Sequence, residues 1–154
     1  MNEAVVQTIL KRWFEKKGFK TIEDIQVNSG NNVDLLAKQG NEKWIIEVKG
    51  DYDKNSAQYN VNFDTAMGQI LKSIIKLDDE TKYCICIPFS KTENGEKLSY
   101  RLILKKYSKS LVFEMLHIHI ILVRDDESVE VIHPNEVRNF FGLISSEIKR
   151  EVGI

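Results

Sequence analysis

A β-hairpin pattern in the first third of the chain constrains the fold more than any other feature of the sequence. Two runs of strand-forming residues, 33–38 and 43–49, flank a polar turn at 39–42 that contains glycine and asparagine. The length of this turn predicts that Lys38 pairs with Lys43. With that register, side chains along each strand alternate between the two faces of the hairpin.

The predicted register separates an apolar face from a face with a charged end. On the charged face Asp34 lies opposite Glu47, and Lys49 follows Glu47 on the same face. The remaining pairs are Leu36–Ile45 and Asn32–Lys49 on the charged face, and Ala37–Trp44, Leu35–Ile46 and Val33–Val48 on the apolar face.

Two carboxylates directly opposite one another require an explanation. Opposite side chains have Cβ atoms about 5 Å apart, and like charges at that spacing destabilise a sheet. A shared proton or a bridging cation removes the repulsion between Asp34 and Glu47. A hard divalent ion such as Mg²⁺ takes oxygen ligands and often uses one or two carboxylates, and Lys49 could then hold a water or a phosphate oxygen beside it. The alternative is a surface hairpin whose charges face water.

The composition fits a single globular domain that spans all 154 residues. Charged residues make up 29% of the chain but the formal net charge is −1, so any basic surface for nucleic acid must be local. Cys84 and Cys86 are poorly placed to bond each other, lack a second pair for a zinc site, and fit a buried strand in a reducing compartment. Because no apolar run approaches about 18 residues, we expect a cytoplasmic protein without a membrane span.

The order of the predicted elements indicates an α/β fold. Apolar residues at helical spacing predict the helices, and a run that is apolar on both faces at 81–88 is typical of a central strand. The predicted elements are a helix at 2–17, a strand at 19–27, the hairpin, a polar irregular segment at 50–60, a helix at 62–77, a strand at 81–88, a helix at 98–115, strands at 117–123 and 128–132, and a last helix from Asn135 through Ile148.

The residues Val33-Asp34, twelve further residues and then Glu47-Val48-Lys49 resemble the motif of the PD-(D/E)XK nuclease superfamily. The resemblance implies a restriction-endonuclease-like αβββαβ core, a mixed central sheet flanked by helices, with an extra C-terminal helix–strand–strand–helix. It also implies that Asp34 and Glu47 bind Mg²⁺, which Mn²⁺ can replace, that the Val48 carbonyl adds a ligand, and that Lys49 positions the attacking water. The sequence departs from the motif at Val33, which stands where proline precedes the aspartate in the family.

Two more residues match positions that members of this superfamily carry. Glu3, in the first predicted helix, matches a glutamate found there in many members. Gln69, in the second predicted helix, matches a glutamine found in several subfamilies. The resemblance implies that both residues belong to the catalytic site, whereas the simpler explanation of Glu3 is an acid favoured near a helix N-terminus.

The resemblance implies a Mg²⁺-dependent DNA endonuclease that hydrolyses phosphodiester bonds. One alternative is a non-enzymatic nucleic-acid-binding or regulatory subunit that retains the nuclease fold, and another is an enzyme that acts on RNA. Since the sequence shows no appended recognition domain, we expect DNA recognition through DNA structure, through a homodimer, or through a separate specificity subunit.

Two predicted helices carry basic residues that could contact a phosphate backbone. Lys72 and Lys76 lie on one, and Arg101 and Lys105 lie on the other. A solvated helix face is the simpler explanation of both groups.

The histidines and one turn offer weaker candidates. His117 and His119 share a face of a predicted strand and could bind a metal, but the sequence shows no partner ligand, and partly buried strand histidines are the alternative. His133, before Pro134, is expected to be structural. Backbone N–H groups of the turn at 29–32 could approach a phosphate, although a simple turn explains the same residues.

Overall fold

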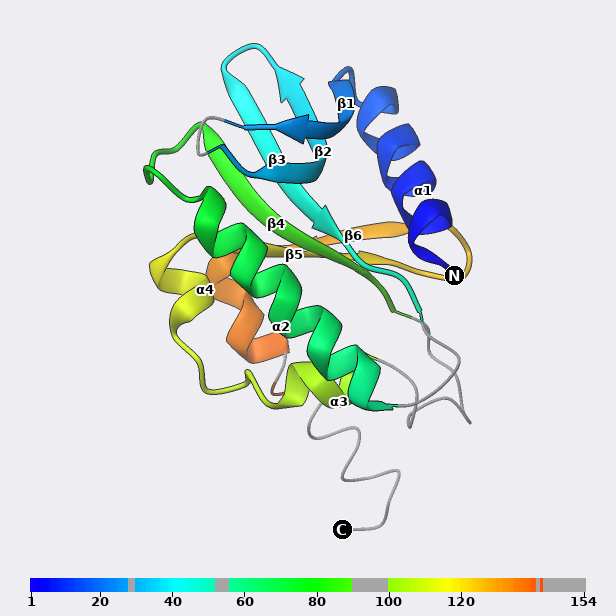
Figure 1. Cartoon of the computed structure of the whole chain (residues 1–154), viewed down its shortest axis with the longest axis vertical. Coiled ribbons are helices and arrows are strands. Elements are labelled where there is room, and N and C mark those ends of the chain that lie inside the picture. The colour runs from blue at the N-terminus through cyan, green and yellow to red at the C-terminus, as the bar shows by residue number, and fades with distance from the viewer. Residues whose placement is uncertain (28–29, 52–55, 90–99, 141, 143–154) are drawn as a thin grey trace, which may run out of the picture.

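The computed structural model describes residues 1–27, 30–51, 56–89, 100–140 and 142. Within those residues, every helix is too short or too polar to span a bilayer. The elements, in chain order (Figure 1), are α1 (Glu3–Lys16), β1 (Lys20–Gln26), β2 (Asn32–Gln39), β3 (Glu42–Val48), α2 (Ser56–Ser73), β4 (Thr81–Pro88), α3 (Tyr100–Lys105), α4 (Val112–Met115), β5 (Ile118–Val123), β6 (Val129–Ile132) and the 3₁₀ turn η2 (Pro134–Glu136).

The strands form one six-stranded mixed sheet in the order β1-β2-β3-β4-β5-β6. β1, β2 and β3 pair antiparallel, β3, β4 and β5 pair parallel, and β6 returns antiparallel to β5. The parallel pairs need crossover connections, and α2 supplies the first while α3 and α4 supply the second. The predicted α/β class and the αβββαβ order are therefore confirmed.

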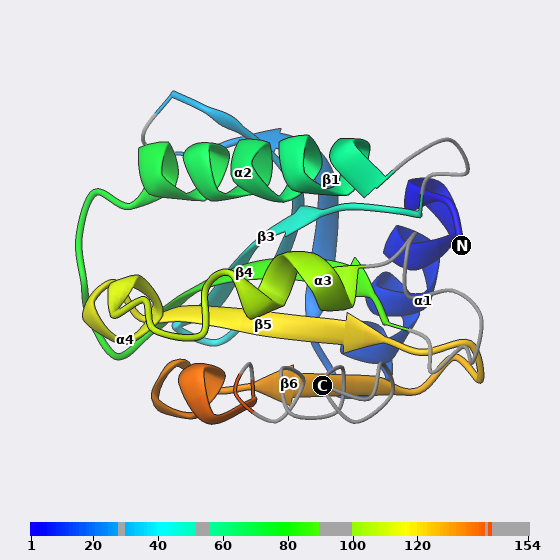
Figure 2. The ribbon, with the colours of Figure 1, turned by 90° about the horizontal axis from the view of Figure 1, so that it is seen from below.

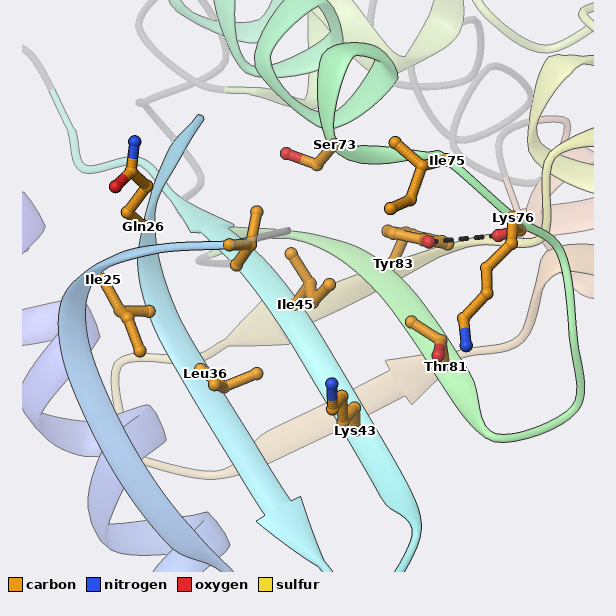
Figure 3. A pocket seen from close by; sticks show the side chains of 11 residues that line it. Ile25, Gln26, Leu36, Lys43, Ile45, Ser73, Ile75, Lys76, Thr81 and Tyr83 are labelled. Carbon is orange, nitrogen blue, oxygen red and sulfur yellow. Dashed lines mark hydrogen bonds between the residues drawn. The ribbon is translucent and has the colours of Figure 1, made fainter. Parts of the chain in front are cut away.

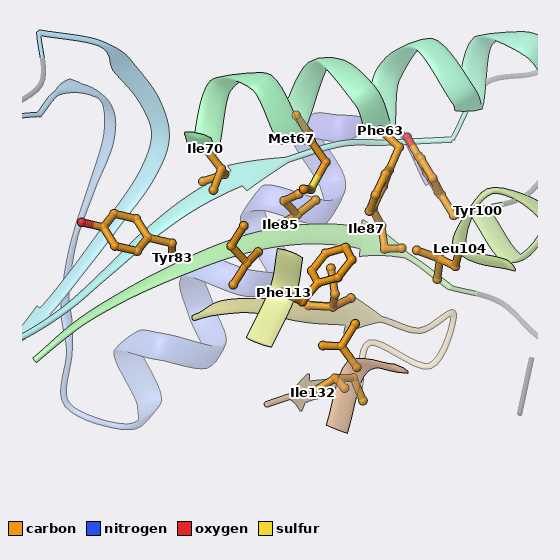
Figure 4. Close-up of a cluster of buried hydrophobic side chains, with 14 of the residues drawn as sticks. Phe63, Met67, Ile70, Tyr83, Ile85, Ile87, Tyr100, Leu104, Phe113 and Ile132 are labelled. Carbon is orange, nitrogen blue, oxygen red and sulfur yellow. The ribbon is translucent and has the colours of Figure 1, made fainter. Parts of the chain in front are cut away.

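Two apolar cores cover the two faces of the sheet. The larger core lies between the sheet and the crossover helices α2, α3 and α4 (Figure 4), and the smaller one lies beneath α1. Seen from below, α2 and α3 run on the same side of the sheet, away from α1 (Figure 2). β4 contributes Ile85 to the first core and the free cysteines Cys84 and Cys86 to the second, so it is buried on both faces as predicted. Each such side chain contributes about 1.5–3 kcal/mol by its removal from water.

α1 forms because its sequence satisfies the rules for a capped amphipathic helix. The side chain of Asn2 accepts the backbone N–H of Val5 at 2.9 Å, which caps the N-terminus. A stripe of apolar residues at helical spacing is buried against the sheet, and Gly18, with φ +91°, follows the end of the helix. This helix delivers Glu3, in its first turn, to the edge of the sheet.

Three predicted helix boundaries are wrong or only partly tested. α2 begins at Ser56, so part of the segment at 50–60 that we expected to be irregular is helical. It ends at Ser73 rather than at 77, so Lys76 lies beyond the helix on which we placed it. The predicted helix at 98–115 is two short helices, because the intervening Ser110 accepts the backbone N–H of Val112 (3.3 Å) and offers the chain a turn instead of a helix. The last helix begins with η2 and continues through Phe140; residue 141 and residues 143–148 of that prediction lie outside the described residues.

Candidate active site

The turn end of the hairpin has the predicted register. Lys38 pairs with Lys43, and the pairing continues through Leu36–Ile45 to Leu35–Ile46. Beyond this point the strands separate, and the backbone N–H of Val48 donates to the carboxylate of Asp34 at 2.7 Å. The Asp34 side chain thus takes the place of a backbone acceptor where the two strands diverge.

The predicted pairs Asp34–Glu47, Val33–Val48 and Asn32–Lys49 all lie outside this ladder. Val33 packs into the core beneath α2, whereas Val48 packs into the core beneath α1, so the two residues are on opposite faces of the sheet. The start of β2 is drawn toward α2 by a hydrogen bond from the Asn31 side-chain amide to the backbone carbonyl of Lys72 (3.0 Å). This long-range contact gives a physical reason for the separation of the strands, which the alternation pattern alone does not contain.

The two predicted acids lie side by side where β2 and β3 separate, a place that we call the split. Glu47 is 1% exposed, and burial, the negative charge of Asp34 and a side-chain hydrogen bond with Asp34 raise the pKa of Glu47 to about 8. The carboxyl group of Glu47 therefore keeps its proton at neutral pH, hydrogen-bonded to Asp34, when no cation is bound. The Oε1 atom of Glu47 is buried and has no hydrogen-bond partner among the described residues.

Glu3 and Lys49 complete the group. Burial and the charge of Asp34 raise the pKa of Glu3, while the ammonium of Lys49 lowers it, so all three charges act on one another. The backbone N–H of Lys49 donates to the carbonyl of Cys86 at 2.9 Å, which fixes Lys49 at the end of the sheet. The next residue, Gly50, abuts α1, because a Cβ atom there would lie 2.2 Å from the backbone nitrogen of Glu3.

Gln69 is not tied to these acids by any hydrogen bond among the described residues. Its Oε1 atom is buried without a partner, as is the Nδ2 atom of Asn62 on the same helix. Ser73, which lies on the same side of α2, lines the surface formed by the first strands of the sheet. The amide side of α2 therefore faces the strands that carry the acids, while the role of Gln69 stays a prediction.

The donor set at the split fits a hard divalent cation. In the described ranges, no group of three or more His, Cys, Asp or Glu side chains is arranged to bind a metal ion. Asp34 and Glu47 nevertheless offer paired carboxylates, and the buried Oε1 of Glu47 lacks the donor that a buried acceptor requires. A cation that displaced the proton of Glu47 would satisfy that oxygen and relieve the repulsion between the acids.

The basic residues are not all where the sequence analysis placed them. Arg101 is 5% exposed, so it does not lie on the solvated helix face that we expected to meet a phosphate backbone. Lys72 and Lys105 are exposed, and Lys76 is exposed beside Asp78, with 3.3 Å between the ammonium and the carboxylate. Their contact with a nucleic acid stays a prediction.

The histidines lie away from the acids, near the start of β5. His119 is buried between the rings of Trp44 and His133, with ring centroids 5.4 and 5.7 Å apart. Burial lowers the pKa of His119 to about 4, which keeps the imidazole neutral. His117 precedes the strand and is exposed. This packing supports the interpretation of His119 as a buried strand histidine.

A separate apolar pocket of about 150 Å³ lies beyond the end of α2 (Figure 3). Leu36, Ile45 and Tyr83 form its floor, and Lys43 and Lys76 stand at its edge. None of the four charged residues of the split lines this pocket, so it is not part of the candidate site.

Sequence reasoning missed three residues that hold the candidate site in place. The hydroxyl of Tyr100 donates to the carbonyl of Gly50 at 2.9 Å, and the hydroxyl of Tyr59 donates to the carboxylate of Asp51 at 3.2 Å. Tyr100 is in an apolar row of its predicted helix, which signals burial but not a hydrogen bond. Tyr59 and Asp51 are in the segment at 50–60 that we expected to be irregular, and the position of this segment directly after Lys49 was the available signal.

Comparison with known proteins places the fold. No protein-family model and no curated protein matches the chain by sequence. An XisH family protein from Nostoc punctiforme is similar in structure, with a TM-score of 0.55, 22% identity, and coverage of 83% of this chain and 98% of that chain. An fdxN element excision controlling factor protein from Anabaena variabilis is similar with a TM-score of 0.56, 20% identity, and coverage of 84% and 98%. These likenesses confirm the fold class, a six-stranded mixed sheet flanked by helices.

Proposed function

We propose that this chain is a divalent-metal-dependent nuclease of the PD-(D/E)XK type that hydrolyses DNA. The observation that carries the proposal is the pair of acids where β2 and β3 separate. Glu47 is buried there beside Asp34, and its Oε1 atom has no hydrogen-bond partner in the part of the chain that the structure describes. The half-buried side chains of Lys49 and Glu3 stand beside that pair, and a carboxyl group whose pKa is shifted by burial and by a neighbouring acid is typical of a functional site.

The residues of the chain have separable tasks in this proposal. Asp34, Glu47 and the carbonyl of Val48 would hold Mg²⁺ or Mn²⁺, and Glu3 would hold a bound water or a second ion. When bound, such an ion supplies charge neutralisation at the scissile phosphate and lowers the pKa of a water. Lys49 orients the attacking water and stabilises negative charge that develops on phosphate oxygens.

The proposed reaction is the hydrolysis of a phosphodiester. The oxygen of water forms a bond to phosphorus, the bond from phosphorus to the 3′ oxygen breaks, and the departing oxygen takes a proton. The products are a 5′-phosphate and a 3′-hydroxyl. Exposed Lys72, Lys76 and Lys105 would contact the backbone, which contributes affinity without sequence information.

Cleavage of a panel of DNAs tests the proposal. Single-stranded, duplex, nicked, flapped and branched DNA, with RNA as a comparison, would be incubated with Mg²⁺ or Mn²⁺ and the wild-type chain, Lys49→Ala or Lys43→Ala. Lys43 is a matched control because it lies at the other end of β3, away from the acids. We expect Lys49→Ala to lose about 10²–10³-fold in rate, the cost of removing one stabilising donor, while Lys43→Ala cuts normally. Undiminished cutting by Lys49→Ala contradicts the proposal.

A second candidate is a regulatory subunit that keeps the fold without cutting DNA. One structural neighbour is named an excision controlling factor, which describes a protein that controls a reaction. Calorimetry with Mn²⁺ separates the candidates, because a nuclease of the proposed type binds the ion through Asp34 and Glu47, and a purely regulatory subunit has no need to.

A further inference from the structure

We infer that Tyr100 is a positioning residue for the proposed active site, acting through Gly50 on Lys49 and Glu3. Tyr100 begins α3, fifty positions along the chain from the glycine that it bonds. The inference rests on the proposed function for its catalytic consequence, but the contact that it invokes can be tested without any activity.

Two tyrosines hold the segment Gly50–Asp51, and we call these contacts the clamp. Its first part is the hydrogen bond from the Tyr100 hydroxyl to the Gly50 carbonyl. It measures 2.9 Å and is buried, and the side chain of Tyr100 is 1% exposed. A buried carbonyl that loses its hydrogen-bond donor costs free energy, because water does not reach it. This bond therefore fixes the position of the backbone directly after Lys49.

Tyr59 and Asp51 form the second part. The Tyr59 ring meets the Tyr100 ring edge to face at 4.8 Å, and its hydroxyl donates to Asp51 at 3.2 Å. The backbone N–H of Asp51 in turn donates to the carbonyl of Met1 at 2.7 Å. Two tyrosines from the crossover helices therefore hydrogen-bond the segment Gly50–Asp51, which in turn hydrogen-bonds Met1 before α1.

The close approach of Gly50 to α1 makes the clamp relevant to the acids. Glu3 lies directly against Gly50, with no room for a Cβ atom between them. A displacement of Gly50 therefore moves Glu3 and Lys49 together, relative to Asp34 and Glu47. Displacing a reacting group by about 1 Å can cost about 10²-fold in rate, so the hydroxyl of Tyr100 should affect turnover although it does not touch the substrate.

Tyr107 supplies a matched control in the same part of the molecule. It follows α3, its ring packs against Phe63 at 5.0 Å, and its hydroxyl donates to the carboxylate of Asp64. Neither Tyr107 nor Asp64 contacts Gly50 or Asp51 through a hydrogen bond recorded among the described residues. Tyr107→Phe therefore removes a tyrosine hydroxyl near α3 without loosening the clamp.

The test compares wild type, Tyr100→Phe, Tyr59→Phe and Tyr107→Phe in the full chain. With Mg²⁺ and the best DNA substrate, we expect Tyr100→Phe to lower kcat by about ten- to hundredfold with KM within about twofold, because positioning acts on turnover rather than binding. Amide exchange at Asp51, followed by NMR, should accelerate by about tenfold or more in Tyr100→Phe. Tyr107→Phe should match wild type in both measurements.

Each result decides the inference. Wild-type kcat and unchanged Asp51 exchange in Tyr100→Phe overturn it, and so does an equal loss in Tyr107→Phe. If the wild-type chain cuts nothing, the proposed function fails while the exchange measurement still decides whether the clamp exists. If Tyr100→Phe does not fold, Tyr59→Phe carries the same two measurements, with a smaller loss expected because its bond reaches a half-buried carboxylate.

Discussion

Two groups of titratable side chains lie toward opposite ends of the central strands. Asp34 and Glu47 meet at the carboxyl end of β3, whereas His119 and His133 meet near the start of β5. Burial opposes charge in both places, raising the pKa of Glu47 to about 8 and lowering that of His119 to about 4. The environments differ, however, since Glu47 faces a second acid and His119 faces aromatic rings.

The difference explains why we propose a metal ion at the acids and none at the histidines. A buried acid beside another acid gains stability when a cation replaces its proton. A neutral His119 is already stabilised by its packing against Trp44. Moving its ring to bind a metal would leave a cavity in the core. A shifted pKa alone therefore does not identify a candidate metal site. The charge of the neighbouring side chains is also needed.

The largest expected effect is the loss of metal binding at the acids. Asp34→Asn or Glu47→Gln should weaken Mn²⁺ binding by more than about 100-fold, because even groups that merely support a ligand change metal affinity about 10–100-fold. His133→Ala should leave the affinity unchanged. Calorimetry with Mn²⁺ on the three variants checks this. A loss of Mn²⁺ binding in His133→Ala would contradict the placement of the metal site at the acids rather than at the histidines.

The second effect concerns stability against pH without metal. Because the folded chain keeps the proton of Glu47 up to about pH 8 and the unfolded chain loses it near pH 4.5, the free energy of unfolding should fall as pH rises between these values. We expect a fall of roughly 2–4 kcal/mol, which Glu47→Gln removes. Urea unfolding of wild type and Glu47→Gln at pH 5, 6.5 and 8 measures it; parallel curves would show that Glu47 is ionised in the fold.

A third effect tests whether close packing builds the acid site. Gly50→Ala should lower the free energy of unfolding by about 2 kcal/mol, since its Cβ would collide with the backbone of Glu3. Gly40→Ala, in the hairpin turn at φ +60°, should cost about 1 kcal/mol from the left-handed backbone alone. Thermal unfolding of both variants compares them, and an equal cost would mean that α1 does not press on Gly50.

The last effect belongs to His119 and has the opposite sign to that of Glu47. The unfolded chain protonates this histidine near pH 6.5, whereas the folded chain resists protonation down to about pH 4. The free energy of unfolding should therefore fall as pH drops through this range, by roughly 2–3 kcal/mol. His119→Phe should flatten the acid side of the pH–stability curve, and an unchanged slope would show that the imidazole is not buried neutral.

The sequence was informative where structure is local. The turn at 39–42 and the alternation of side chains predicted the register at Leu35–Ile46 because both depend on neighbouring residues. The candidate residues Asp34, Glu47 and Lys49 came from that register and from the resemblance to a nuclease motif. Their convergence agrees with the structure, while their activity stays a prediction.

The rest depends on contacts between distant segments. Where β2 separates from β3, Asn31 bonds α2 and Asp34 bonds the backbone of Val48, and no pattern near residue 33 encodes either contact. The burial of Arg101 reverses the expectation from a basic helix face, because neighbouring elements decide which side of a short helix is covered. The bond from Tyr100 to Gly50 likewise joins residues that are unrelated in local sequence.

The most direct test of the account is the Mg²⁺-dependent release of 5′-phosphate ends from DNA by the wild-type chain and by Glu47→Gln. Buried Glu47 is the ligand on which the proposed chemistry depends, and Gln keeps its size while removing its charge. We predict cleavage by the wild type and none by the variant. Equal cleavage by both proteins, or cleavage by neither on any substrate of the panel, would contradict the assignment of a nuclease site to these acids.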